Sequence, residues 1–314
     1  MPLRSPPNND RDEADRMMTT ASNLPGQDLA MAGPHVVVLI DLLGQSSELA
    51  KWDFVPNTVK ETATWVPAAR NTIGRVLKWR EEFERLHSTY LKSLQEFEEQ
   101  LAPREPVDVR KSFDEYRQTS IHFQHFSDTL IIYSPLQNEH DYWQVSNIDG
   151  MLHTCGALML AALHDKTVFR GAIEVGMLIR FPNGEPYGPA LAKAHHLESK
   201  VAGHPRILVG PGVLSYLDWI KDRPEHDGAA EANRGAAMSC QNCITKDTDG
   251  CSIVDYLNDE FANYGNDPAI WRKIQADTFP FIVSELDRFK KENNQQLAER
   301  YERLAAYFRS RGSS

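Results

Sequence analysis

The stretch HVVVLID, residues 35–41, limits most strongly what this chain can fold into. Residues 35–40 form a largely apolar, β-branched run that is too short for a typical helix, so they predict a buried strand. Asp41 closes this strand, and the Gly, Gln, Ser and Ser at 44–47 predict a turn and a helix start. A carboxylate at the exit of a buried strand, beside the amides of a following helix, suits Mg²⁺ or Mn²⁺ carrying a polyphosphate. A strand-end or helix-capping aspartate is the alternative interpretation of Asp41 alone.

The composition is that of an ordinary globular protein, with 314 residues, 41% hydrophobic and 25% charged. The formal net charge of −10 makes long-range steering of DNA or RNA unfavourable, so metal ions and a few local cations would hold a phosphate-bearing ligand. No apolar run approaches the roughly eighteen residues of a membrane span, and the chain start lacks the apolar core of a signal peptide. We therefore expect a cytoplasmic protein with no nucleic-acid or membrane partner.

Hydrophobic patterns beyond the first strand predict strands that alternate with helices. We expect a short helix at 42–50, a long amphipathic helix at 76–101, hairpin strands at 119–125 and 129–134, a helix at 146–164, a strand at 168–179, a helix at 189–201, a strand at 206–210 and a helix at 211–220. The apolar stripe of 76–101 suits packing on the chain's own sheet better than a dimer interface. This order, with one tight hairpin, predicts a mixed-sheet α/β (α+β) sandwich with a ferredoxin-like core.

The two ends of the chain differ from its middle. Residues 1–33 lack periodicity and predict a disordered tail, whereas 222–250 are rich in Gly, Ala, Asp and Asn and predict a loop or linker. Helices are expected near 267–293 and 295–310. We therefore divide the chain into the tail, a domain over 34–221 with a helical insert at about 57–110, and a linker with a helical extension over 222–314.

The cysteines form no disulfide framework, because four in this length are too few. Cys240 and Cys243 with Cys251 suggest zinc, but a structural site needs four suitably spaced ligands, and the nearby His226 lies upstream in a loose loop. Free thiols are the favoured interpretation. The chain also lacks a nucleophilic-serine elbow and a phosphate-binding loop with its lysine, which disfavours a hydrolase of that type or a P-loop enzyme.

Three blocks, in this order, resemble the catalytic domain of class III nucleotidyl cyclases. They are the strand ending in DLLGQS (41–46), the hairpin segment FSDTLII (126–132), and a later block with Arg170, YGPA (187–190), LE (197–198) and PRI (205–207). The sequence of these blocks is most similar to that of the pyrimidine cyclases of bacterial Pycsar antiphage systems, and the similarity covers about residues 35–217. The resemblance implies a class III cyclase fold and a lyase that makes cyclic UMP or cyclic CMP as a signal to a separate effector protein. It also implies a homodimer, in which the metal-binding acids of one subunit face the base pocket of the other.

The resemblance places two Mn²⁺ or Mg²⁺ ions on Asp41 and Asp128, assisted by the Ile40 carbonyl. The ribose 3′-hydroxyl must attack the α-phosphorus while pyrophosphate leaves, which a two-metal clamp serves well. The two acids lie farther apart in sequence than in ordinary members of the class, because the long helix occupies the interval. The loop after the strand, with Leu43, Gly44 and Gln45, is the expected phosphate cradle, although relatives often have Phe at the position of Gln45.

The later block departs from the family pattern. The positions that commonly hold a ribose-orienting Asn and a transition-state Arg are Ala192 and His196 here. Arg170, Lys193 and His196 are the candidate cations that would replace them. The alternative is a catalytically silent module of the same fold that binds a nucleotide or a partner.

The resemblance maps the two base-contact positions of the family to Gln124 and Glu185. The Lys/Asp pair with which adenylyl cyclases read adenine is therefore absent, which favours a pyrimidine. Glu185 suits a cytosine amino group, and Gln124 offers an amide donor and acceptor to uracil. Family analogy favours UTP over CTP.

Overall fold

The computed structural model describes residues 31–44, 50, 55, 57–101, 120–137, 143–224, 228–259, 261 and 268–312. Its strands are β1 (Met31–Leu42), β2 (His122–Phe126), β3 (Thr129–Pro135), β4 (Phe169–Arg180), β5 (Pro186–Tyr187), β6 (Ile207–Val209), β7 (Ile244–Lys246) and β8 (Ser252–Val254). Its helices are α3 (Val59–Leu101), α5 (Ser146–His164), α6 (Pro189–His196) with a following π-helical turn η3 (Leu197–Val201), α7 (Pro211–Lys221), α8 (Gly228–Asn242), α10 (Pro268–Lys291) and α11 (Gln295–Ser310).

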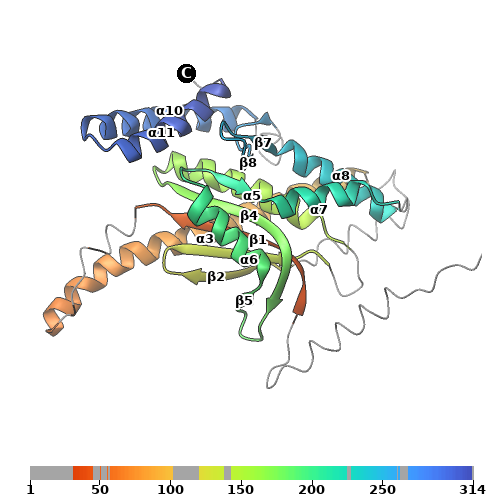
Figure 1. Ribbon diagram of the computed structural model, residues 1–314, viewed down its shortest axis with the longest axis horizontal. Helices are drawn as coiled ribbons and strands as arrows, with labels where there is room; N and C mark the ends of the chain where they lie inside the picture. The colour runs from red at the N-terminus through yellow and green to blue at the C-terminus, as the bar shows by residue number, and fades with distance from the viewer. Residues whose placement is uncertain are drawn as a thin grey trace, which may run out of the picture.

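All of these strands belong to one mixed sheet with the order β2-β3-β1-β4-β6-β8-β7, and β5 pairs with β4 (Figure 1). β1 is antiparallel to both β3 and β4, whereas β4 and β6 are parallel. The first part of the chain therefore has the β-α-β-β-α-β order of the ferredoxin-like pattern, with β4, β1, β3 and β2 side by side. This confirms the predicted mixed α/β architecture.

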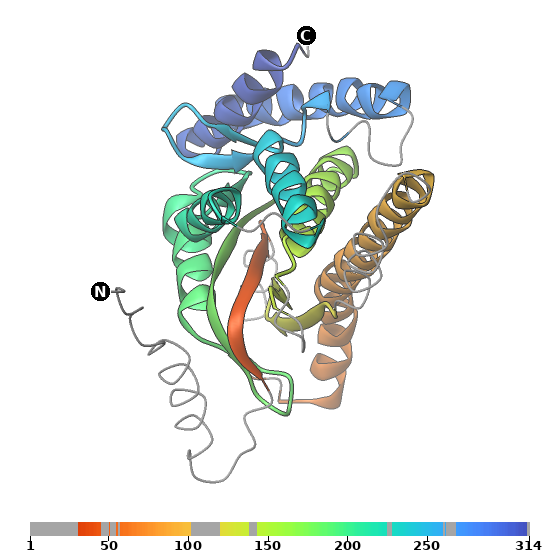
Figure 2. The same ribbon diagram turned by 90° about the vertical axis from the view of Figure 1, so that its right-hand side faces the viewer.

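β1 lies at the centre because its side chains are buried on both faces of the sheet. Val36, Val38 and Ile40 belong to the large core under α3 and α5, and Val37 and Leu39 join a smaller core under α6. Figure 2 shows α3 on one side of these strands and α6 on the other. A continuous run of apolar residues, rather than an alternating one, is what a strand covered on both faces requires.

The hairpin, the strands and most helices of the middle region agree with the predictions to within a few residues. The predicted start of the long helix at 76 is wrong, because α3 begins at Val59 and runs for 43 residues with Pro67 inside it. In its first part Val59, Trp65 and Ile73 are exposed, and the buried positions Ala69 and Thr72 carry small side chains. Periodicity, which reports burial, therefore could not detect this part of the helix.

The predicted loop or linker over 222–250 is also wrong for most of its residues. α8 occupies Gly228–Asn242, and β7 forms a hairpin with β8, which pairs with β6 and extends the main sheet. The predicted C-terminal helices are confirmed as α10 and α11, which pack side by side, with α10 against α5 (Figure 1). Among the described helices, none combines the length and the apolar character needed to cross a membrane.

Candidate active site

Strand register brings the expected metal ligands to one end of the sheet. Asp41, near the end of β1, lies opposite Thr129 on β3 and opposite Arg170 on β4. Asp128 precedes Thr129 in the two-residue turn of the hairpin, and its carbonyl accepts a hydrogen bond of 3.4 Å from the Leu42 amide. The two aspartates are thus neighbours in space, although a 43-residue helix lies between them in sequence.

The Asp41 carboxylate lies among opposing charges. Its Oδ1 accepts a 3.5 Å hydrogen bond from the Thr129 hydroxyl, and its Oδ2 lies 3.3 Å from Arg170 Nη2. Burial and the negative charges of Glu198 and Asp128 together raise the pKa of Asp41 to about 6, against the opposing effect of Arg170. A carboxylate with this pKa is mostly ionised at neutral pH, but a divalent cation would stabilise the charge better than Arg170 alone.

Asp41, Asp128, Arg170 and Glu198 form one charged cluster, the Asp41 group, and Glu198 is the member for which the sequence suggested no role. Its Oε1 accepts a 2.6 Å hydrogen bond from Arg170 Nε, and its side chain is only 5% exposed. The residue lies in the π-helical turn after α6. The LE pair of the resemblance contained this residue, but only the fold shows that it points toward β4 and reaches Arg170.

The two α6 candidates are placed differently from Arg170. Lys193 and His196 are both exposed, as is Ala192. Among the described residues, neither Lys193 nor His196 has a hydrogen bond or ion pair to Asp41 or Asp128. Lys193 acts electrostatically on buried Glu174, whose pKa is raised by burial and partly lowered again by this lysine. The geometry therefore favours Arg170 over the α6 residues as the cation of this site.

The two expected base-contact residues come together at the β4–β5 turn. Gln124 Nε2 and the Tyr133 hydroxyl both donate to the Gly184 carbonyl, at 2.9 and 2.6 Å, and Glu185 is the next residue along. Glu185 is exposed, and its amide donates to the Asn183 side chain. Because Gln124 lies opposite Ile131, which lies opposite Leu39, strand alternation puts Gln124 on the same face of the sheet as Asp41.

The expected phosphate cradle is described only in part. The Leu43 amide donates a 2.9 Å hydrogen bond to the Val168 carbonyl, so a phosphate would have to displace that bond. Gly44 is exposed with φ of 91°, which favours glycine at this turn. Gln45 lies outside the described residues. The Ile40 side chain is buried in the core on the face opposite to Asp41.

The Cys240 and Cys243 thiols lie in a buried polar cluster with residues of α5. Cys240 Sγ donates to Asp149 Oδ1 at 3.6 Å, and Cys243 Sγ lies 3.4 Å from His153 Nε2. The Tyr90 hydroxyl donates to the second Asp149 oxygen at 2.5 Å. All four cysteines are free thiols. In the described part of the chain, no group of three or more His, Cys, Asp or Glu side chains is arranged to hold a metal ion.

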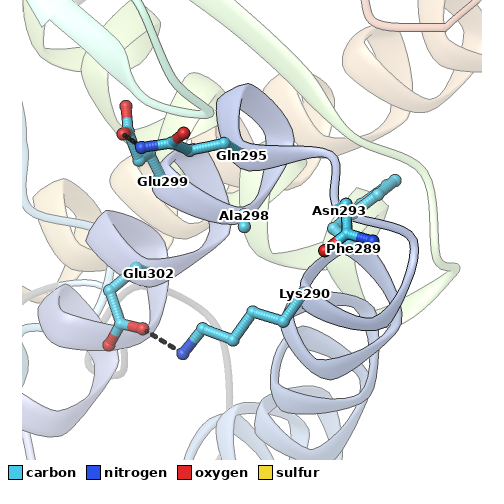
Figure 3. Close-up of a pocket in the computed structure, with 7 residues that line it drawn as sticks. All are labelled: Phe289, Lys290, Asn293, Gln295, Ala298, Glu299 and Glu302. Carbon is cyan, nitrogen blue, oxygen red and sulfur yellow. Dashed lines mark hydrogen bonds and ion pairs between the residues drawn. The ribbon is translucent and has the colours of Figure 1, made fainter.

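A separate hollow lies where α10 turns into α11, on elements other than those that carry the Asp41 group (Figure 3). It is lined by Phe289, Lys290, Asn293, Gln295, Ala298, Glu299 and Glu302. An ion pair of 2.9 Å between Lys290 and Glu302 bridges the two helices. We assign this hollow no role in the chemistry at Asp41.

Comparison with known proteins does not extend this assignment: no family model and no curated protein matches the chain.

Proposed function

We propose that this protein is a pyrimidine nucleotide cyclase with a class III cyclase fold, which converts UTP to 3′,5′-cyclic UMP and pyrophosphate. CTP, giving cyclic CMP, is the alternative substrate. The observation that supports the proposal is the meeting of Asp41 and Asp128 at one end of the sheet, beside Arg170. The resemblance to antiphage cyclases further suggests a cytoplasmic homodimer whose product acts on a separate effector.

The donor set fits Mn²⁺ or Mg²⁺, because both cations prefer carboxylate oxygens and Asp41 is held in a site that ionises below neutral pH. Asp41 and Asp128 would hold the ions, which when bound polarise the triphosphate and stabilise charge on the attacking and leaving oxygens. Arg170 lies within reach of the same group and would face negative charge that develops on the leaving pyrophosphate.

Recognition of the base would fall to Gln124 and Glu185. Because Gln124 Nε2 already donates to the Gly184 carbonyl, its Oε1 and its second N–H remain as the groups that a pyrimidine edge can meet. Glu185 is exposed on the neighbouring turn and presents a further acceptor. In the proposed dimer, these groups of one subunit complete the metal site of the other.

The second candidate is a catalytically silent module of the same fold. Ala192 has no group with which to orient a ribose, and His196 on the same helix is exposed and has no hydrogen bond or ion pair to the described residues of the Asp41 group. Such a module would bind nucleotide without turnover.

Incubation of the purified protein with each of the four nucleoside triphosphates and Mn²⁺, with product analysis by mass spectrometry, separates these candidates. We expect cyclic UMP, and cyclic CMP in smaller amount. Product from ATP or GTP alone would exclude the pyrimidine assignment. If no triphosphate gave a product, the enzyme assignment would be excluded and the silent module would be the remaining candidate.

A further inference from the structure

Arg170 is shared by two carboxylates that hold it unequally. Its Nε lies 2.6 Å from Glu198 Oε1, whereas its Nη2 lies 3.3 Å from Asp41 Oδ2. The Glu198 side chain is 5% exposed and that of Asp41 is 17% exposed. The shorter and more deeply buried contact is the stronger of the two, so Glu198 is the principal partner of Arg170.

An irregular turn delivers Glu198 to this position. The segment Leu197–Val201 is π-helical, and the Ala202 amide donates to the Leu197 carbonyl across five residues at 2.8 Å. A π-helical turn holds an additional residue, which changes the direction of the side chains in it, and such turns are frequent at functional sites. α6 itself is fixed on β1 and β4 through Ala190 and Ala194. The turn therefore places a buried carboxylate over the strand that carries Arg170.

Competition for Asp41 follows from this geometry. The guanidinium and a divalent cation both need the Asp41 carboxylate, and Nη2 already contacts Oδ2. If Glu198 lost its charge, Asp41 would be the carboxylate toward which Arg170 turns, and the cation would have to displace a full ion pair. With Nε held by Glu198, a divalent cation has to displace only the 3.3 Å contact between Nη2 and Asp41 Oδ2.

We propose that Glu198 is a positioning residue, which holds Arg170 by its Nε edge and thereby keeps Asp41 accessible to a divalent cation. This inference rests on the proposed function, because it assumes that Asp41 binds Mn²⁺ or Mg²⁺. It extends that function by assigning a role to a residue that lies one contact away from the metal ligand. The released Nη2 would remain close to the phosphates, because Nε stays tethered.

The test is a double-mutant cycle on Mn²⁺ affinity, measured by electron paramagnetic resonance of free Mn²⁺ without nucleotide. We expect Glu198→Gln to weaken Mn²⁺ binding about tenfold in the wild-type background, because Arg170 closes on Asp41. In an Arg170→Met background the same change should weaken binding less than about threefold, since only the loss of a nearby charge remains. Asp41→Ala, which should abolish Mn²⁺ binding and leave the signal of free Mn²⁺ undiminished, identifies the site being measured.

Asp249→Asn is the matched control, because Asp249 likewise pairs with an arginine, the buried Arg206, at 2.7 Å, but on the turn between β7 and β8. It should leave Mn²⁺ affinity unchanged. Should Glu198→Gln fail to fold, Glu198→Asp, which keeps the charge on a shorter side chain, should show an intermediate loss in the same cycle.

Equal losses with and without Arg170, or no loss at all, would overturn the positioning role. A wild-type protein that binds no Mn²⁺ through Asp41 would overturn both this role and the metal site. Mn²⁺ binding with the expected coupling, but without a cyclic product, would overturn only the proposed cyclase activity.

Discussion

At the scale of single residues, the position of Asp41 lowers the stability of the folded protein at neutral pH. Burial, Glu198 and Asp128 together raise its pKa to about 6, against 3.8 for an unperturbed aspartate. The folded state therefore binds the proton more tightly than the unfolded state does. Protonation of Asp41 therefore stabilises the fold. This contribution is complete below about pH 4 and is lost as the pH rises through 6, so the ionised carboxylate is destabilising at neutral pH.

We therefore expect Asp41→Asn to raise the free energy of unfolding by about 1 kcal/mol at pH 7.5, after allowance for solvent screening. Below pH 4 the gain should vanish, because wild-type Asp41 is then neutral as well. Urea unfolding at the two pH values measures this difference. Asp165→Asn, at an exposed ion pair with Lys78, is the control and should change stability little at either pH. A loss of stability at pH 7.5 would contradict a destabilising charge at Asp41.

At the scale of elements, the attachment of α6 to β4 depends on one glycine. Gly188 precedes α6 with φ of 150°, and a Cβ there would lie 2.7 Å from the Met177 carbonyl oxygen. An alanine would therefore have both the wrong backbone conformation and a contact that no side-chain rotation relieves. The α6–η3 segment carries Glu198, so this glycine also supports the candidate site.

We expect Gly188→Ala to lower the free energy of unfolding by about 2 kcal/mol. Gly235→Ala, inside α8, is the matched control, because a Cβ there has no atom within 4 Å. That change should raise stability by about 0.5 to 1 kcal/mol through helix propensity. Thermal or urea unfolding of the two variants compares them. Equal effects in the two variants would show that the close approach of α6 to β4 is unimportant.

Elements with strong burial patterns were predictable from sequence, and those that depend on tertiary contacts were not. In β1, the hairpin and α5, the pattern of apolar residues indicates which side chains are buried. β7 and β8 have three residues each and are strands only because β6 offers an edge to pair with. The same holds at the site: Asp41 and Asp128 could be named from motifs, whereas the role of Glu198 depends on a π-helical turn that no local pattern indicates.

At the scale of the whole molecule, the proposed function requires two copies of the chain. The metal ligands of one subunit would work with the base contacts of the other, so a monomer would hold only half of each site. We expect the specific activity to fall as the protein is diluted, with its midpoint at the dimer dissociation constant measured by sedimentation. Unchanged activity per chain in a solution shown to be monomeric would contradict the shared site.

In the proposed mechanism Asp41 and Asp128 act together on one substrate. The most direct test of this is the formation of cyclic UMP from UTP and Mn²⁺ by Asp41→Ala and Asp128→Ala, quantified by mass spectrometry beside the wild type. We predict that each variant loses at least about a hundredfold in turnover while its circular dichroism and cooperative unfolding are retained. Wild-type turnover in either folded variant would show that the metal site lies elsewhere.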